Sequence, residues 1–257
     1  MGVKPDTGIK PELATILDEM FAIGGNHDVK KDLEIRNKII NSFSLEELLL
    51  EDHNEINIRV GKSALHYLDA NAVHVQTTDT ATASKYMMPF FERLLQSDDW
   101  NYYELKLLIA SMYLTPNIEQ AHKLYVKAIK RISEFQVVRE VDIQEGYLAL
   151  NMCARLLYTK YFEDDVDIDW VTDQFETCFH RLEVLESIED NYQLGIPLLV
   201  TKIRQAIFKQ DEKPIREFMD ELYNWSNSTT EIVNILKSEI RLYKTSEKYF
   251  ALLGGEE

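Results

Sequence analysis

The sequence predicts an all-α fold, a tetratricopeptide-like superhelix of antiparallel helix hairpins with a concave inner face. Three observations lead to this prediction. Helix-forming residues dominate the 257-residue chain, and 9 Gly and 6 Pro leave little material for the turns of an all-β fold. Apolar residues make up 45% of the chain, which is enough for a substantial core. From residue 98 onward, densely apolar helical segments alternate with amphipathic ones, as expected for hairpins with one inner and one outer helix.

Helical spacing of apolar residues defines the elements of the first third. Pro11 suits a first helical turn, and the apolar repeat that follows it ends at Gly24-Gly25. A second helix covers 33–43. Ser44-Leu45-Glu46-Glu47 has the form of a capping box and starts a short third helix. Residues 56–60 alternate like a strand, but no partner strand is evident, so we expect a helix from 56 to 68.

The segment from Asp98 to Tyr113 is the one around which we arrange the remaining elements. Asp98 and Asp99 can cap a helix start, and the residues after them are apolar on too many sides for a helix with a solvated face. Just before this inner-layer helix, Pro89 either starts a new helix or kinks a continuous one within 79–97. In both cases we expect these neighbours of Pro89 to point inward: Met87, Met88, Phe90 and Phe91.

After this inner helix, apolar and amphipathic helices alternate. Asn117 and Gln120 offer a cap and its partner for an amphipathic helix that ends near Phe135. Gly195 and Pro197 interrupt the third apolar helix, and Ser228 with Glu231 forms a capping box for the last helix. The expected later helices are 117–135, 139–162, 169–185, 191–208, 214–225 and a final one from 228.

We expect three regions: N-terminal helices of the repeat domain (1–75), a degenerate helical-repeat regulatory domain (76–253) and a frayed tail (254–257). The chain has 28 basic and 44 acidic residues, a net charge of −16, so its surface should repel nucleic acid and acidic lipid. There is no signal peptide and no apolar run of transmembrane length, which predicts a cytoplasmic protein. Cys153 and Cys178 fall in apolar helical patterns and are expected to be small buried hydrophobes.

The motifs of common catalytic chemistry are missing from the sequence. It contains no glycine-rich phosphate loop and no nucleophile elbow. The six histidines never fall at the spacing that brings two metal ligands onto one helical face. We therefore expect no enzyme, no cofactor and no metal site.

Polar side chains on the apolar helix 139–162 are the candidate ligand-binding residues. Asn151 and Arg155 stand four apart and share a face, along which Tyr147 and Tyr158 also lie. An Asn side chain can pair with a peptide backbone, and an Arg can bind a carboxylate in a fork. In the alternative interpretation, Asn151 satisfies a neighbouring loop and Arg155 faces solvent or an internal carboxylate such as Glu104.

Two further polar residues, Thr201 and Gln205, repeat this four-residue arrangement on the third apolar helix. A groove lined by both sets would hold an extended peptide. Ordinary surface polarity is the alternative for this second pair.

Trp100-Asn101-Tyr102-Tyr103-Glu104-Leu105, preceded by Phe90-Phe91-Glu92-Arg93-Leu94-Leu95, resembles the Trp-x-x-Tyr-Glu-Leu region of the Rgg/GadR/MutR transcriptional regulators of Gram-positive bacteria. Leu148-Ala149-Leu150-Asn151 resembles a second feature of that family, an Asn in the next apolar helix. The resemblance covers about residues 80 to 225. Where family members often carry a further Asn, this chain has Ala110.

The resemblance implies a homodimeric tetratricopeptide-like domain whose concave face binds a short signalling peptide, as in quorum sensing. It also implies DNA contact through a helix-turn-helix domain, which nothing in residues 1–60 provides. Our first hypothesis is therefore the peptide-sensing regulatory domain of an Rgg-like regulator. The alternatives are a helical-repeat protein interaction scaffold without a small ligand, and an all-α enzyme.

Overall fold

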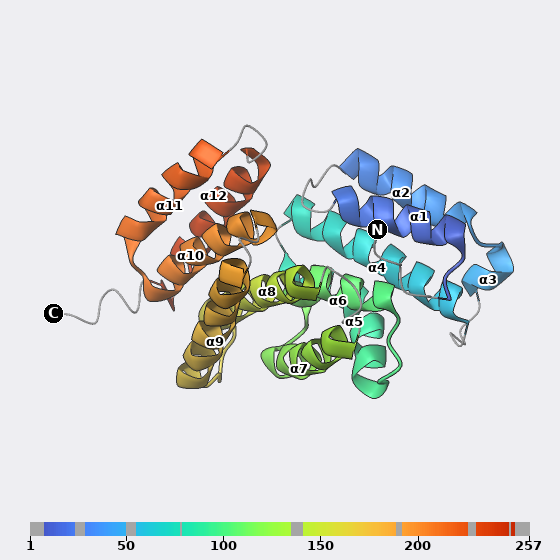
Figure 1. The fold of residues 1–257 in the computed structure, drawn as a ribbon, viewed down its shortest axis with the longest axis horizontal. Helices are drawn as coiled ribbons and strands as arrows, with labels where there is room; N and C mark the ends of the chain where they lie inside the picture. Colours follow the sequence, from blue (N-terminus) through green and yellow to red (C-terminus); the bar gives the residue numbers. More distant parts are fainter. Residues whose placement is uncertain are drawn as a thin grey trace. The chain divides into compact units, whose positions relative to one another are not determined.

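The computed structural model describes residues 8–23, 29–49, 55–77, 79–134, 141–188, 192–225, 230–246 and 248–249. Within these ranges the regular structure is entirely helical and no strand occurs, which confirms the all-α prediction (Figure 1). The chain divides into two compact units, Met1–Val141 and Asp142–Glu257, called here the first and second units. The boundary expected at residue 75 lies in the last turn of a helix of the first unit, and the tail 254–257 lies outside the described residues.

The first unit is built around a long pair of helices, α4 and α5, which pack side by side, while α2 and α6 each pack against α4. Its elements are α1 (Pro11–Ile23), α2 (Val29–Asn41), α3 (Leu45–Leu49), α4 (Ile56–Thr77), α5 (Thr80–Gln96), α6 (Tyr102–Ser111), the 3₁₀ turn η1 (Met112–Leu114) and α7 (Ile118–Glu134). The region from 56 onward is thus helical, as expected.

Two of the three helix caps predicted for this unit are confirmed. Ser44 and Glu47 form the expected capping box, with the Glu47 carboxylate accepting from the Ser44 N–H at 2.6 Å. The Asn117 side chain accepts from the Gln120 N–H at 2.9 Å. The expectation that Asp98 or Asp99 caps α6 is wrong. Asn101 is the cap, because Glu104 lies at the position from which its carboxylate reaches back to the Asn101 N–H.

Pro89 lies inside α5, which runs through it as one helix. Met87, Phe90 and Phe91 are buried as expected, but Met88 is 39% exposed, so its inward orientation was predicted wrongly. Four apolar residues in five cannot all face one side, because successive residues of a helix are turned by about 100°.

The second unit contains α8 (Val141–Phe162), α9 (Ile168–Ser187), the 3₁₀ turn η3 (Tyr192–Leu194), α10 (Gly195–Lys209), α11 (Glu212–Trp225) and α12 (Thr230–Lys244). The expected helix 191–208 therefore begins as a 3₁₀ turn and becomes α-helical at Gly195, which leaves Pro197 in the first turn. The capping box expected at Ser228 lies outside the described residues.

Aromatic contacts join the helices of this unit. Phe175 of α9 stacks on Phe208 of α10 with ring centroids 4.5 Å apart, and Tyr161 of α8 contacts Tyr243 of α12 at 5.6 Å. Cys153 and Cys178 are both buried and form no disulfide bond, which confirms their expected burial.

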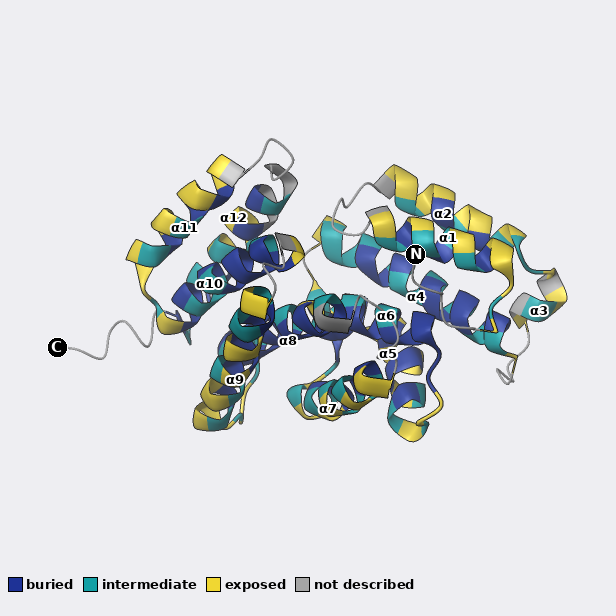
Figure 2. Cartoon of the chain, viewed as in Figure 1, coloured by how far each residue is buried: buried dark blue, intermediate teal, exposed yellow. Residues whose placement is uncertain are grey.

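The expected difference between inner and amphipathic helices is visible in the burial pattern (Figure 2). On α6 and α8 most residues are buried, whereas α7 buries one side only. That side of α7 consists of Ala121, Leu124, Ala128 and Ile132. No helix among the described residues is long and apolar enough to cross a membrane.

Candidate functional site

One side of the largely buried helix α8 carries a strip of residues that are partly open to solvent. Successive members lie one, three, four or seven residues apart, so they occupy one side of the helix. Tyr147 is the most open of them, with 40% of its surface exposed. We call the following set the α8 strip: Ile143, Tyr147, Leu150, Asn151, Tyr158 and Phe162.

The α8 strip contains no charged residue. Lys160, the nearest lysine in sequence, lies on another side of the helix and donates through Nζ to the Phe208 carbonyl. Burial raises the pKa of the Tyr147 phenol, so this side chain is a neutral hydroxyl at physiological pH. The strip therefore offers apolar and aromatic surface with one amide and two phenols as hydrogen-bonding groups.

Three of the residues predicted from the sequence, Tyr147, Asn151 and Tyr158, share the α8 strip. The structure adds Ile143, Leu150 and Phe162 to them. Helical spacing alone would have found these three, since Ile143 and Phe162 each lie four residues from a predicted one and Leu150 lies three residues from Tyr147.

Arg155 does not lie open on this strip. It is 1% exposed, and its guanidinium donates from Nη1 to Thr159 Oγ1 at 2.7 Å and from Nη2 to the Glu163 carboxylate. The guanidinium also lies 5.5 Å from the centre of the Tyr158 ring. This is the internal carboxylate contact considered above, made with Glu163 and not with Glu104. An arginine held in this way orients the Tyr158 ring and joins α8 to the loop after it.

Thr201 and Gln205 of α10 are engaged within the second unit. The Thr201 hydroxyl donates to the Pro197 carbonyl at 2.8 Å inside α10, and the side chain is fully buried. Gln205 is half-buried and donates to the Glu176 carboxylate at 3.0 Å. The hydroxyl of Thr201 is thus used by the helix itself, as is common for Thr within helices.

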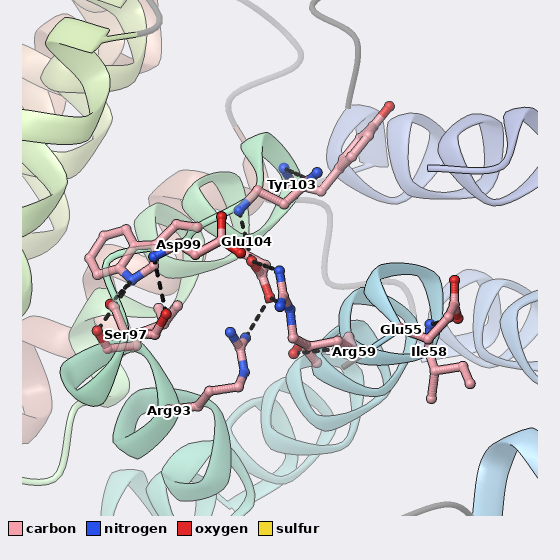
Figure 3. A network of polar contacts seen from close by, with 12 residues as sticks. Glu55, Ile58, Arg59, Arg93, Ser97, Asp99, Tyr103 and Glu104 are labelled. Carbon is pink, nitrogen blue, oxygen red and sulfur yellow. Dashed lines mark hydrogen bonds and ion pairs between the residues drawn. The ribbon is translucent and has the colours of Figure 1, made fainter. Parts of the chain in front are cut away.

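A second polar cluster surrounds Glu104 in the first unit (Figure 3). Glu104 is fully buried, and its carboxylate is bound by Arg59 through two contacts of 2.8 and 3.2 Å. Arg93 lies 2.7 Å from the same carboxylate, and the Asn101 N–H donates to it at 2.7 Å. Burial lowers the pKa of the Arg93 guanidinium.

The other residues of the Trp-x-x-Tyr-Glu-Leu motif also hold the first unit together. Trp100 donates through Nε1 to the Ser97 carbonyl at 2.7 Å, at the end of α5. Lys127 of α7 donates to the carbonyls of Leu94, Leu95 and Ser97 at 3.0 to 3.1 Å. A cation there suits the negative end of the α5 dipole. The motif therefore forms a structural junction among α4, α5, α6 and α7.

Among the described residues, no group of three or more His, Cys, Asp or Glu side chains is arranged to hold a metal ion. Comparison of the chain with protein-family models, with curated proteins and with solved structures gives no match. The α8 strip is the candidate site because of its own chemistry: an uncharged, partly open aromatic surface on an otherwise buried helix.

Proposed function

We propose that this chain is a peptide-sensing regulatory domain of the Rgg-like type, with a tetratricopeptide-like arrangement of hairpins, and that the α8 strip binds a short signalling peptide. The observation that carries the proposal is that none of the described residues on the side of α8 that forms the strip is charged. An ordinary surface helix exposes Lys, Glu or Arg on such a side. Aromatic and aliphatic residues that are open to solvent on one side of a helix can mark a binding surface.

The dimensions of the strip suit a short extended peptide. Ile143 and Phe162 are separated by 19 helical steps of about 1.5 Å, which gives a length of about 28 Å. An extended peptide advances about 3.3 Å per residue, so about eight or nine residues would follow the strip from end to end.

The strip also has side chains suited to contact both the side chains and the backbone of a peptide. Tyr147, Tyr158 and Phe162 supply large apolar faces at a small loss of side-chain entropy, since aromatic side chains have two rotatable angles. The amide of Asn151 has both a donor and an acceptor, the two groups that a peptide bond presents. Apolar contacts would supply affinity, and the amide would set the register of the peptide.

Binding would act on the second unit as a whole. Tyr158 contacts Phe162, whose ring lies 5.6 Å from Tyr243 of α12, so a ligand on the strip contacts side chains that also pack the last helix. In this proposal, occupancy changes the packing of α12 against α8 and thereby dimer geometry, the usual output of a ligand-controlled regulator.

A display library of random nonapeptides selected on the immobilised chain tests the proposal. Selected peptides, labelled with fluorescein, should bind with an anisotropy change that Tyr147→Ala and Asn151→Ala each weaken about tenfold or more, a typical loss for a central contact residue. The matched control is Tyr86→Ala, which removes a tyrosine of similar exposure (42%) from α5 of the first unit. Peptides that bind equally to all variants would disprove the proposal.

The second candidate is a protein interaction scaffold, with the strip occupied by a helix of a partner. The internal position of Arg155 favours it, because the carboxylate-binding group expected for a peptide terminus is already paired with Glu163. A strip that selects only folded helical binders and no extended nonapeptides would favour this candidate.

A further inference from the structure

Charge is distributed unequally between the two units. Residues 1–141 contain 16 basic and 21 acidic residues, a net charge of −5, whereas residues 142–257 contain 12 basic and 23 acidic residues, a net charge of −11. The unit that carries the α8 strip is therefore the more acidic, although it is the shorter of the two.

Acidic residues are concentrated where the α8 strip ends. Phe162 is the last residue of α8, and the connection to α9 and its first turn contain the residues called here the acidic loop: Glu163, Asp164, Asp165, Asp167 and Asp169. The last four are exposed. The partial negative charge at the C-terminal end of α8 adds to this field.

Part of this charge is neutralised within the second unit. Arg155 binds Glu163, and Lys248 lies 2.9 Å from the Asp164 carboxylate. Asp167 caps α9 by accepting from the Trp170 N–H at 3.0 Å. Asp165, in the connection after α8, and Asp169, in the first turn of α9, are exposed carboxylates.

We infer that the ligand of the α8 strip is a cationic peptide, with aromatic or aliphatic side chains along the strip and its basic residues beside the acidic loop. This inference rests on the proposed function. The binding surface is the uncharged strip, and the acidic loop decides which charge is accepted at one end of it. An acidic peptide would be repelled by both the loop and the net charge of the unit.

The charge also predicts how binding responds to salt. Exposed carboxylates attract a basic ligand over about 10 Å at 0.1 M ionic strength, and this attraction is screened at higher salt. Apolar contacts on the strip are not weakened by salt in the same way. A cationic ligand should therefore lose affinity with rising salt while keeping a salt-independent remainder.

Three fluorescein-labelled nonapeptide pools test the inference. The pools share the same randomised aromatic and aliphatic positions and differ only at two terminal positions, which are Lys, Ser or Glu. We expect the Lys pool to bind at least about fivefold more tightly than the Ser pool, and the Glu pool to bind most weakly, since each exposed charge pair contributes up to about 1 kcal/mol.

The variants Asp165→Asn and Asp169→Asn test whether the acidic loop causes the preference for the Lys pool. Each should weaken the Lys pool by about two- to fivefold and leave the Ser pool unchanged. Asn tolerates the left-handed backbone of Asp165, whose φ is 56°, so the first variant keeps the loop conformation. The matched control is Asp220→Asn, which removes an exposed carboxylate from α11.

The outcomes separate the two proposals. If all three pools bind alike and Tyr147→Ala weakens them all, the strip binds peptides but the charge inference is wrong. If the Lys pool binds tightest but Asp220→Asn weakens it as much as Asp165→Asn does, the acidic loop is not the selecting element. If no pool binds above background, both the inference and the proposed function fail.

Discussion

Each unit contains a buried arginine–glutamate contact, but the buried partner differs between the two. In the first unit Glu104 is fully buried, and it is enclosed by Arg59, Arg93 and a backbone N–H. In the second unit the guanidinium of Arg155 is the buried group, and the side chain of its partner Glu163 is 19% exposed. Water can therefore reach one end of the second contact, while the carboxylate of the first is closed off.

The comparison shows which polar residues of buried helices are enclosed and which stay partly open to solvent. The sequence indicated Arg155 as a polar group in an apolar helix and Glu104 as an internal carboxylate, and both form contacts within their own unit. Asn151 and the tyrosines of the α8 strip are left at the surface of the same helix that buries Arg155. Position around the helix, which changes by about 100° per residue, thus separates the buried Arg155 from the partly open Asn151.

The largest expected effect is the loss of the carboxylate in the first unit. Glu104→Gln leaves the half-buried guanidinium groups of Arg59 and Arg93 beside a neutral amide and should lower the free energy of unfolding by about 3–5 kcal/mol, as for other broken buried ion pairs. Urea denaturation followed by fluorescence measures it. Trp100 is buried in the first unit, so its emission reports on this region.

Glu19→Gln is the control for this prediction. Glu19 forms an ion pair with Lys38 at 2.7 Å, and both side chains are largely open to solvent. Removing such a surface pair should change stability by less than about 1 kcal/mol. Equal effects of the two substitutions would show that the Glu104 contact is no more important than a surface pair.

Arg155→Met should have a smaller effect than Glu104→Gln. Methionine keeps much of the buried volume, and the partly exposed Glu163 carboxylate can recover hydration, so we expect a loss of about 1–3 kcal/mol. Far-UV circular dichroism in urea measures it. A loss larger than that of Glu104→Gln would reverse the comparison between the two units.

Substitution of one helical glycine in each unit tests how tightly that unit is packed. A Cβ on Gly61 of α4 would lie 2.5 Å from the Phe43 ring, and a Cβ on Gly146 of α8 would lie 2.5 Å from a methyl group of Leu194. We expect Gly61→Ala to lower stability by about 1–3 kcal/mol, and Gly146→Ala by less, because a Leu side chain can change rotamer more easily than a ring can move.

The control for the glycine substitutions is a repacked pair. Phe43→Leu should restore part of the stability lost in Gly61→Ala, because it removes the ring atoms nearest to the new Cβ. Denaturation of the two single variants and the double variant measures the coupling. If the losses of stability in the two single variants simply add in the double variant, contact with the Phe43 ring is not the reason that residue 61 must be glycine.

The smallest expected effects are those of pH, and they have opposite signs in the two units. Burial lowers the pKa of Lys160 in the second unit to about 8. An unfolded lysine titrates near pH 10.4, so between these values the unfolded chain binds more protons and the free energy of unfolding rises with pH. We expect a gain of about 1 kcal/mol, because Lys160 is partly open to solvent and screening reduces the effect.

Tyr103 in the first unit should act in the other direction. Burial, followed by the nearby Asp18 carboxylate, raises its pKa to about 12. An unfolded tyrosine loses its proton near pH 10, so above that pH the unfolded chain binds fewer protons and stability falls. Denaturation curves of Lys160→Met and Tyr103→Phe at several pH values separate the two contributions. If the free energy of unfolding of Lys160→Met still rises with pH between about 8 and 10.4, another group causes the rise.

The sequence was informative where a local pattern decides the structure. The helices, the Ser44 capping box and the burial of Cys153 and Cys178 all follow from spacing within one segment. The placement of Arg155 could not be predicted, because its partner Glu163 follows the end of the helix and the side-chain rotamer decides whether it reaches back. Asn101 was missed as a cap because two aspartates immediately before it have the same capping chemistry.

The most direct test of the account is photo-crosslinking from the α8 strip. Benzoylphenylalanine placed at position 147 should crosslink to a selected peptide in high yield, and the same residue at position 86, an equally open site on α5, should give only background. Mapping the crosslinked peptide would give its register on the strip. Crosslinking in equal yield from both positions, or from position 86 alone, would contradict the claim that the uncharged side of α8 is where this chain binds its ligand.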